Sequence, residues 1–171
     1  MLYNLNFYIK YISSQIIPNQ SQLDDLFAIE NVVMVGYPNG LYDEKNNYPI
    51  FRTGKTASHP AVDYNGEKKA MLDVSCVPGS SGSPVFILDE GWIRHKNGSI
   101  TQGSRIYFIG IENSMPIRYS QALYEEQISP KGKKKLIKLT KYYVVDDIKL
   151  GYYIKSSEID GFKDQIKNLN L

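Results

Sequence analysis

The stretch Gly79-Ser80-Ser81-Gly82-Ser83-Pro84 carries the strongest chemical signal in this sequence. Glycine adopts positive φ angles and lets another chain approach the backbone closely, so glycines on both sides of two serines predict a tight turn. The apolar pair Val85-Phe86 follows and indicates that the turn leads into a buried strand. A serine in such a turn has an exposed hydroxyl, with backbone N–H groups pointing into the same concavity. That arrangement suits a nucleophile with an oxyanion hole.

This hexapeptide resembles the nucleophile signature Gly-x-Ser-Gly-[Gly/Ser]-Pro of the trypsin/chymotrypsin-like serine peptidases. It differs from the Gly-x-Ser-x-Gly elbow of α/β-hydrolases, because position 83 is serine. Four further segments are similar to strands of the second barrel in bacterial trypsin-like and HtrA-like peptidases, namely 33–40, 49–58, 72–76 and 109–113. The resemblance therefore extends over roughly residues 31–155.

The resemblance implies a role for several residues around the hexapeptide. Ser81 matches the nucleophile, and the N–H groups of Gly79 and Ser81 match the oxyanion hole, whose donors must lie about 3 Å from the developing charge. The strand that pairs with the substrate backbone is matched by Ile111, Glu112 and Asn113.

Ser75 and Ser80 also match positions of the family, and they bear on cleavage specificity and on activation. Ser75 falls near the floor of the specificity pocket, where a neutral residue does not favour Arg or Lys at the cleaved position. Ser80 stands where many secreted members of the family have an acidic residue. Activation by burying a new N-terminal amine against that acid is therefore not expected here.

The general base and its orienting acid are not identifiable in the sequence. In the family both residues come from the first barrel. Only about 30 residues precede the matched region, which is too few to form a six-stranded barrel. His59 lies at a strand end and His95 in a polar loop, so both fit a structural or surface role better than a catalytic one. Asp24 and Asp25 precede the matched region but fit capping or surface roles. Serine without a base is a weak nucleophile, so the chain alone is expected to be inactive.

The elements that must position Ser81 are mainly short strands. Apolar and β-branched runs bounded by turn residues predict strands over 5–12, 32–35, 50–58, 68–76, 84–88, 105–113, 136–145 and 149–155. Residues 18–30 predict a loop with one helical turn capped by Ser21, residues 91–103 a long polar hairpin loop, and residues 156–169 a helix capped by Ser156 or Ser157.

This order predicts an all-β barrel or sandwich with a C-terminal helix. The resemblance implies more narrowly a Greek-key β-barrel of the chymotrypsin-like fold. We therefore expect residues 1–30 to be an inter-barrel linker or the tail of a missing first barrel. Residues 31–155 would form the second barrel, and residues 156–171 the terminal helix.

Composition sets broader limits. The 171 residues are 42% hydrophobic and 22% charged, as expected for one globular domain. A net charge of +2 does not favour nucleic acid as a partner, and the basic cluster of Lys131, Lys133, Lys134 and Lys135 fits a solvated loop. No apolar run approaches the ~18 residues of a membrane span, and the N-terminus has no signal-peptide pattern. We therefore expect a cytoplasmic protein without membrane contact.

Cofactors and metals are not expected. The single cysteine, Cys76, fits a buried structural thiol, and one cysteine is consistent with a reducing compartment. No His or Cys pair has metal-ligand spacing, and the Ser81 turn lacks the lysine of a phosphate-binding loop.

Three functional hypotheses remain open. The chain is either part of a serine endopeptidase, a non-catalytic module that grips an extended peptide by strand addition, or a remnant without function. In the first case the missing barrel is encoded upstream, lost from the gene, or supplied by another chain. The expected partner in the first two cases is a peptide or protein.

Overall fold

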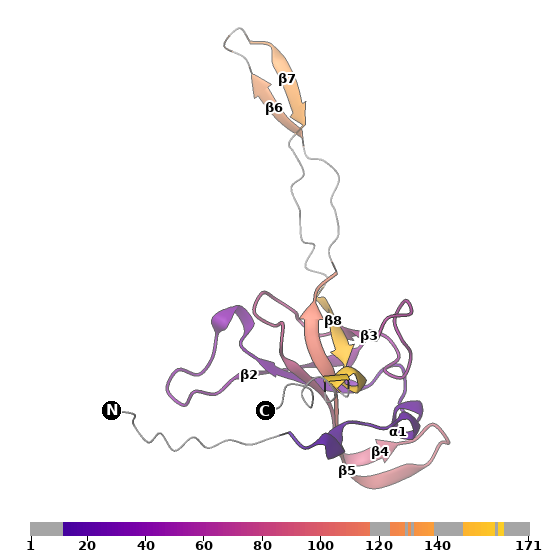
Figure 1. The fold of residues 1–171 in the computed structure, drawn as a ribbon. Helices are drawn as coiled ribbons and strands as arrows, with labels where there is room; N and C mark the ends of the chain where they lie inside the picture. Colours follow the sequence, from indigo (N-terminus) through magenta and orange to yellow (C-terminus); the bar gives the residue numbers. More distant parts are fainter. Residues whose placement is uncertain are drawn as a thin grey trace.

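Six antiparallel strands form a closed sheet in the computed structural model, which describes residues 12–116, 124–128, 130, 132–138, 149–159 and 161–162 (Figure 1). Around the closed sheet the strands are β1 (Asn31–Gly36), β2 (Ile50–Thr56), β3 (Lys69–Asp73), β8 (Leu150–Lys155), β5 (Ile100–Ser114) and β4 (Pro84–Arg94). β4 pairs back onto β1, which completes the closure. The predicted all-β class is confirmed at this level.

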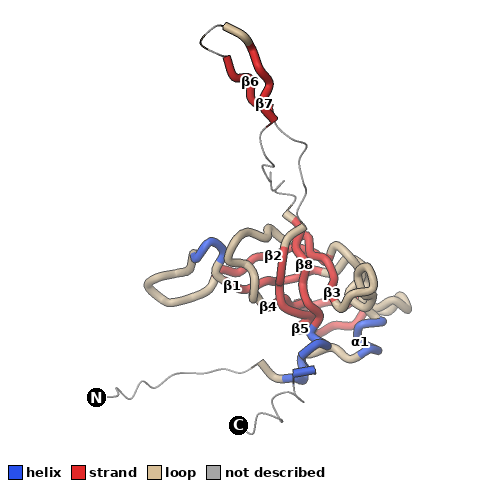
Figure 2. Tube along the Cα trace, turned by 45° about the horizontal axis from the view of Figure 1, so that its top comes forward, coloured by secondary structure: helices blue, strands red, loops and turns tan. Residues whose placement is uncertain are grey.

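Two shorter groups of elements accompany the closed sheet (Figure 2). Strands β6 (Tyr124–Ile128) and β7 (Lys134–Lys138) pair only with each other among the described strands. The helical segments are α1 (Gln20–Asp24) and three 3-10 turns, η1 (Ser14–Ile16), η2 (Pro38–Gly40) and η3 (Ser156–Glu158).

The core lies inside the closed sheet, because strand side chains alternate between its two faces. On β1, Val32 and Met34 are buried while Val33 and Val35 are half-buried. Leu26 reaches this core from the segment before β1, and Leu23 of α1 packs against it, so the end of α1 lies on the closed sheet. The remaining core members are Ala70, Leu72, Val74, Cys76, Val85, Ile87, Ile109 and Tyr153.

Two local predictions are wrong. The expected polar loop at 91–103 is instead a β-ribbon, in which Gly91 pairs with Gly103 and Arg94 with Ile100. The backbones of β4 and β5 stay paired over this stretch, but neither face of the ribbon is buried. The sequence therefore shows no hydrophobic alternation there that would predict the two strands. The helical turn α1 is capped by Asn19 rather than Ser21, since Asn19 and Gln22 form a reciprocal capping box.

Several predicted elements lie partly outside the described residues. The strand predicted over 5–12 falls there almost entirely, and so do residues 139–145 of the strand predicted over 136–145. The predicted C-terminal helix begins as the 3-10 turn η3, and Ile159, Gly161 and Phe162 continue in helical conformation. Residues 163–171 are outside the described part.

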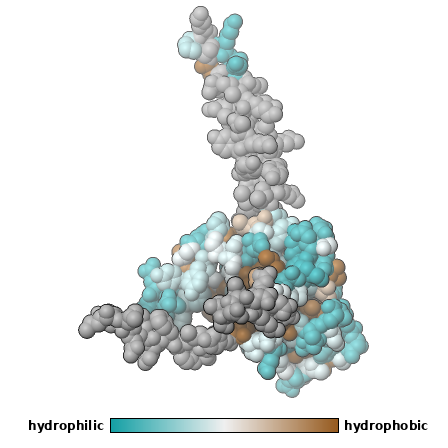
Figure 3. Space-filling view, in the orientation of Figure 1, coloured by the Kyte–Doolittle hydropathy of each residue, from teal (hydrophilic) through white to brown (hydrophobic). Residues whose placement is uncertain are grey.

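The surface in Figure 3 is mostly hydrophilic, with hydrophobic residues in small separate groups. None of the described helices is both long enough and apolar enough to cross a membrane.

Candidate active site around Ser81

Ser81 lies in a tight turn between β3 and β4, as the glycine pattern predicts. Gly79 and Gly82 both adopt left-handed backbone conformations, with φ angles of 85° and 91°. Within the turn the N–H of Ser80 donates to the Val77 carbonyl at 2.9 Å, and the N–H of Ser83 donates to the Ser80 carbonyl at 2.9 Å. The turn is therefore a hydrogen-bonded structure that presents an exposed Ser81.

The turn packs closely on the loop that follows β1. A Cβ at Gly79 would lie 2.9 Å from the Tyr37 carbonyl oxygen and 3.0 Å from the Asn39 nitrogen. The N–H of Asn39 donates to the Pro78 carbonyl at 2.7 Å, which holds the peptide bond before Gly79. Only glycine at position 79 satisfies both the backbone angle and this close approach.

Two N–H groups of the turn are free in the described part of the chain. The N–H groups of Ser80, Gly82 and Ser83 each donate a hydrogen bond to a backbone carbonyl. Those of Gly79 and Ser81 have no acceptor among the described residues. These are the two donors that an oxyanion hole beside Ser81 requires.

Ser80 is buried and tied to β2 rather than exposed to solvent. Its hydroxyl accepts a hydrogen bond from Arg52 Nη2 at 2.9 Å and from the N–H of Val77 at 3.0 Å. Arg52 Nη1 also donates to the carbonyl of Ser75. Arg52 thus connects β2 to both ends of the segment that precedes Ser81.

The sequence did not single out Arg52. The signal available was its position, because Arg52 alternates with Ile50, Gly54 and Thr56 on the side of β2 that turns away from solvent. A charged residue on the side of a strand that turns away from solvent is expected to have a specific polar partner, because burying a charge without one is costly.

Strand β5 holds the other side of the turn. The N–H of Gly82 donates to the Glu112 carbonyl at 2.8 Å, and the N–H of Glu112 donates to the Ser83 carbonyl at 2.9 Å. Ser81 Oγ donates to the Asn113 carbonyl at 3.0 Å. The structure therefore brings Ser81, Glu112 and Asn113 together, while the main chain of Glu112 is engaged inside the protein.

Ile111 and Ser75 lie differently from these residues. Ile111 is 38% exposed and pairs with Pro84 on one side and Ile154 on the other. Ser75 is exposed, and its carbonyl is bound by Arg52. Their predicted roles in substrate binding stay predictions.

The Glu112 side chain is the unexpected feature of the site. It is 1% exposed, and its Oε2 atom has no hydrogen-bond partner among the residues that the structure describes. Burial raises the pKa of Glu112, while a hydrogen bond with the Ser81 side chain and the charge of Arg52 lower it. Burial is the larger effect, so this carboxyl is more basic than an ordinary glutamate.

Cys76 lies beside this carboxyl, as a buried thiol. Burial, with a smaller contribution from the Glu112 charge, raises the pKa of Cys76 to about 11. Gly151 on β8 makes room for both groups, since a Cβ there would overlap Cys76 Sγ and lie 3.7 Å from Glu112 Oε1. The thiol is thus protonated at neutral pH and fits the predicted structural role.

Both histidines lie at the opposite end of the sheet from Ser81. β4 begins three residues after Ser81, runs for 11 residues and ends directly before His95. At about 3.3 Å per residue this is roughly 35 Å of extended strand. His59 belongs to the same end, because its Nε2 atom lies 3.3 Å from Lys96 Nζ. Neither imidazole is within hydrogen-bond reach of Ser81.

Asp25 and His95 meet at that far end, a pairing that sequence separation concealed. Asp25 Oδ2 lies 2.6 Å from His95 Nδ1, and Thr101 Oγ1 lies 2.9 Å from His95 Nε2. The hydrogen bond with His95 lowers the pKa of Asp25. This group fastens the β4–β5 ribbon to the end of α1. Asp24 contributes its carbonyl to Lys96 Nζ at 2.6 Å.

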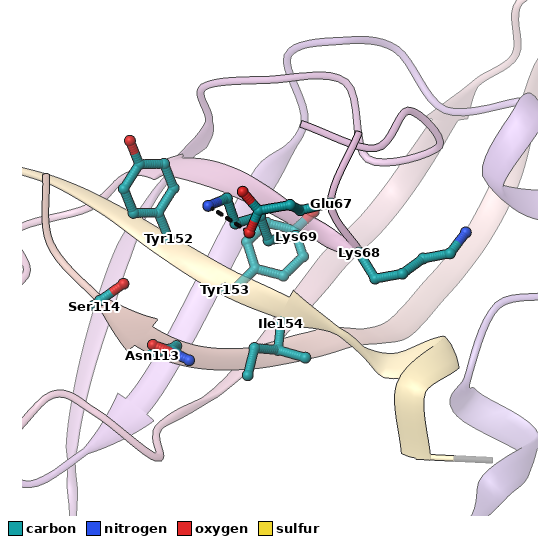
Figure 4. Close-up of a pocket in the computed structure, with 8 residues that line it drawn as sticks. All are labelled: Glu67, Lys68, Lys69, Asn113, Ser114, Tyr152, Tyr153 and Ile154. Atoms are coloured by element: carbon teal, nitrogen blue, oxygen red, sulfur yellow. Dashed lines mark ion pairs between the residues drawn. The ribbon is translucent and has the colours of Figure 1, made fainter. Parts of the chain in front are cut away.

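A cavity of about 270 Å³ adjoins Asn113 (Figure 4). Asn113 and Ser114 line it from β5, Tyr152 and Ile154 from β8, and Glu67 to Lys69 from the start of β3. Lys69 forms an ion pair with Glu67 at 2.9 Å and lies 5.0 Å from the centre of the Tyr152 ring. The cavity therefore combines an aromatic wall with charged groups next to the strand that binds the Ser81 hydroxyl.

The described residues contain no group of three His, Cys, Asp or Glu side chains placed to hold a metal ion. No family model matches the chain, and comparison with curated proteins and with solved structures found no match.

Proposed function

We propose that this chain is the nucleophile-bearing barrel of a trypsin-like serine peptidase. The observation that carries the proposal is the pair of free N–H groups on Gly79 and Ser81, which flank an exposed Ser81 hydroxyl in a turn closed by its other donors. The strand order supports it as well. The first four strands stand side by side as β4-β1-β2-β3, which is the spatial order of a Greek key.

The reaction is acyl transfer to Ser81. Its Oγ attacks the peptide carbonyl, and the N–H groups of Gly79 and Ser81 bind the resulting oxyanion. An extended substrate lies along β5 at Asn113, where the adjoining cavity receives a side chain. A histidine acting as base would have to come from another segment or chain, because His59 and His95 are at the far end of β4.

Labelling with a fluorophosphonate probe tests this proposal, since the probe reacts only with activated serines. We expect any labelling of the wild-type chain to be lost in Ser81→Ala and retained in Ser104→Ala. Ser104 is an exposed serine on β5 outside the site and serves as the matched control. Labelling that persists in Ser81→Ala would contradict the assignment of the nucleophile.

The distance between Ser81 and both histidines favours a second candidate, a non-catalytic module that binds an extended peptide. A folded wild-type chain that resists the probe, together with peptide binding that survives Ser81→Ala, would select this candidate over the peptidase. Peptide binding is measured by isothermal titration with the same variants.

A further inference from the structure

We infer that the buried carboxylate of Glu112 accepts the proton of the Ser81 hydroxyl, so that Ser81 and Glu112 form a catalytic dyad that needs no histidine. The inference rests on the proposed function, because it assumes that Ser81 is the nucleophile. It differs from that proposal in placing the base inside this chain, on β5.

The backbone fixes the two residues against each other. The two residues that follow Ser81 are joined to the Glu112 main chain, since Gly82 N–H donates to Glu112 O at 2.8 Å and Glu112 N–H donates to Ser83 O at 2.9 Å. This pair of bonds acts as a short stretch of antiparallel pairing. The Glu112 side chain consequently emerges beside the serine turn, near enough for the Ser81 hydroxyl to lower the pKa of its carboxyl.

The two side chains face different environments. Ser81 is exposed and accessible to a substrate, whereas Glu112 is 1% exposed and has one oxygen without a partner in the described part of the chain. A buried carboxylate oxygen without a donor is costly, so such a group needs a function or a ligand to explain it. Accepting a proton from the adjacent hydroxyl satisfies this oxygen during the reaction.

The charged and titratable neighbours leave Glu112 available as a base. From β2, the charge of Arg52 lowers the pKa of Glu112, but its guanidinium donates to the Ser75 carbonyl and the Ser80 hydroxyl and forms no ion pair with Glu112 in the described structure. From the segment after β3, the Cys76 thiol is protonated. β8 contributes Gly151, which has no side chain, and the buried Tyr153, which pairs with Glu112 in register and whose pKa burial raises. Burial therefore dominates and makes the carboxylate a stronger proton acceptor.

The hydroxyl has one hydrogen and two acceptors, the Asn113 carbonyl and the Glu112 carboxylate. Rotation of the hydroxyl toward Glu112 starts the reaction. As the Oγ–C bond forms, the Oγ–H proton moves to Glu112, and the carbonyl electron pair moves onto oxygen. Collapse of this intermediate breaks the bond to the leaving group, which takes the proton back from Glu112. Water then repeats both steps and releases Ser81.

The decisive experiment compares fluorophosphonate labelling rates of wild type, Glu112→Gln and Glu30→Gln from pH 4 to 9. Glu30 is the matched control, since it is a second buried glutamate whose pKa is raised by burial, outside the site. The wild-type rate should rise with pH and level off above the pKa of Glu112, because only the carboxylate accepts the proton. Glu112→Gln should lose this profile and label about 100-fold more slowly.

One further variant and one measurement that needs no labelling complete the test. Glu112→Asp retains the negative charge, but its side chain is one methylene shorter and holds the carboxylate farther from the Ser81 hydroxyl. This variant should label at least about tenfold more slowly. In a chain with ¹³C-labelled glutamate, the pKa of Glu112 measured by NMR should be higher in Ser81→Ala than in wild type, because the variant lacks the hydroxyl that lowers this pKa.

Each outcome separates the two proposals. Wild type that labels while Glu112→Gln labels equally fast would overturn the dyad and leave Ser81 as the nucleophile. Wild type that fails to label at every pH would overturn both. A Glu112 pKa that is identical in wild type and Ser81→Ala would overturn the contact on which the dyad depends.

Discussion

A serine hydroxyl becomes a nucleophile only when its surroundings can take its proton and stabilise the charge that develops. At Ser81 the second requirement depends on backbone geometry, since the free N–H groups belong to residues 79 and 81. That geometry in turn depends on Gly79, which has a positive φ angle and no room for a side chain.

Gly79→Ala and Gly82→Ala are expected to differ, although both residues have positive φ angles. Any alanine there carries a backbone cost of about 1–2 kcal/mol in the free energy of unfolding. Gly79→Ala adds a clash with the Tyr37 carbonyl, while a Cβ at Gly82 meets nothing within 4 Å. Urea unfolding should therefore show a larger loss for Gly79→Ala. Equal losses would contradict the close packing of the turn.

At the scale of elements, the buried cation Arg105 connects β4 and β5 to the segment just before β1. Arg105 on β5 is 9% exposed and contacts Asp89 on β4 at 2.6 Å and Glu30, just before β1, at 3.0 Å. Burial raises the pKa of Glu30. The positive charge of the Arg105 guanidinium offsets the repulsion between the neighbouring carboxylates of Glu30 and Asp89 inside the protein.

Arg105→Ala is expected to lower the free energy of unfolding by about 3–5 kcal/mol, because it leaves buried carboxylates without their counter-charge. Urea unfolding followed by circular dichroism measures this loss. Lys68→Ala is the control, since its ion pair with Asp63 at 2.8 Å is largely exposed and should contribute far less. A similar effect of both variants would show that Arg105 is not a structural anchor.

At the scale of the whole molecule, the closed sheet separates two groups of polar residues. The turn with Ser81, Arg52 and Glu112 lies where β4 begins, and the cluster of Asp25, His59 and His95 lies where β4 ends. The chain therefore places its imidazoles away from its candidate nucleophile.

The double variant His59→Gln/His95→Gln should accordingly leave the rate of Ser81 labelling unchanged, within twofold. Its melting temperature should fall, because the Asp25–His95 contact at 2.6 Å is lost. The rate and the melting temperature are measured on the same sample. A labelling rate that falls at least tenfold in a folded variant would place a histidine in the reaction and overturn this separation.

The turn and the strands were predictable because their signals are local. Glycine spacing around Ser81 predicts the positive φ angles at Gly79 and Gly82, and alternation predicts β1, β2 and β3 to within a few residues. The capping residue of α1 and the length of the β4–β5 ribbon were not predictable in this way. Asn19 competes with nearby polar residues for the same role, and pairing in an exposed ribbon leaves no hydrophobic pattern.

Sequence by itself determined that Ser81 is held in a glycine turn leading into a buried strand, since such a turn depends on neighbouring residues only. Tertiary structure decided which side chains and carbonyls meet the turn around Ser81, including Arg52, which the sequence did not single out. Arg52, Glu112 and Asn113 come from β2 and β5, and strand closure rather than sequence proximity brings them to the turn. His95 lies far from Ser81, although the two residues are only fourteen positions apart in the sequence. An extended strand between them converts a short separation in sequence into a long distance in space.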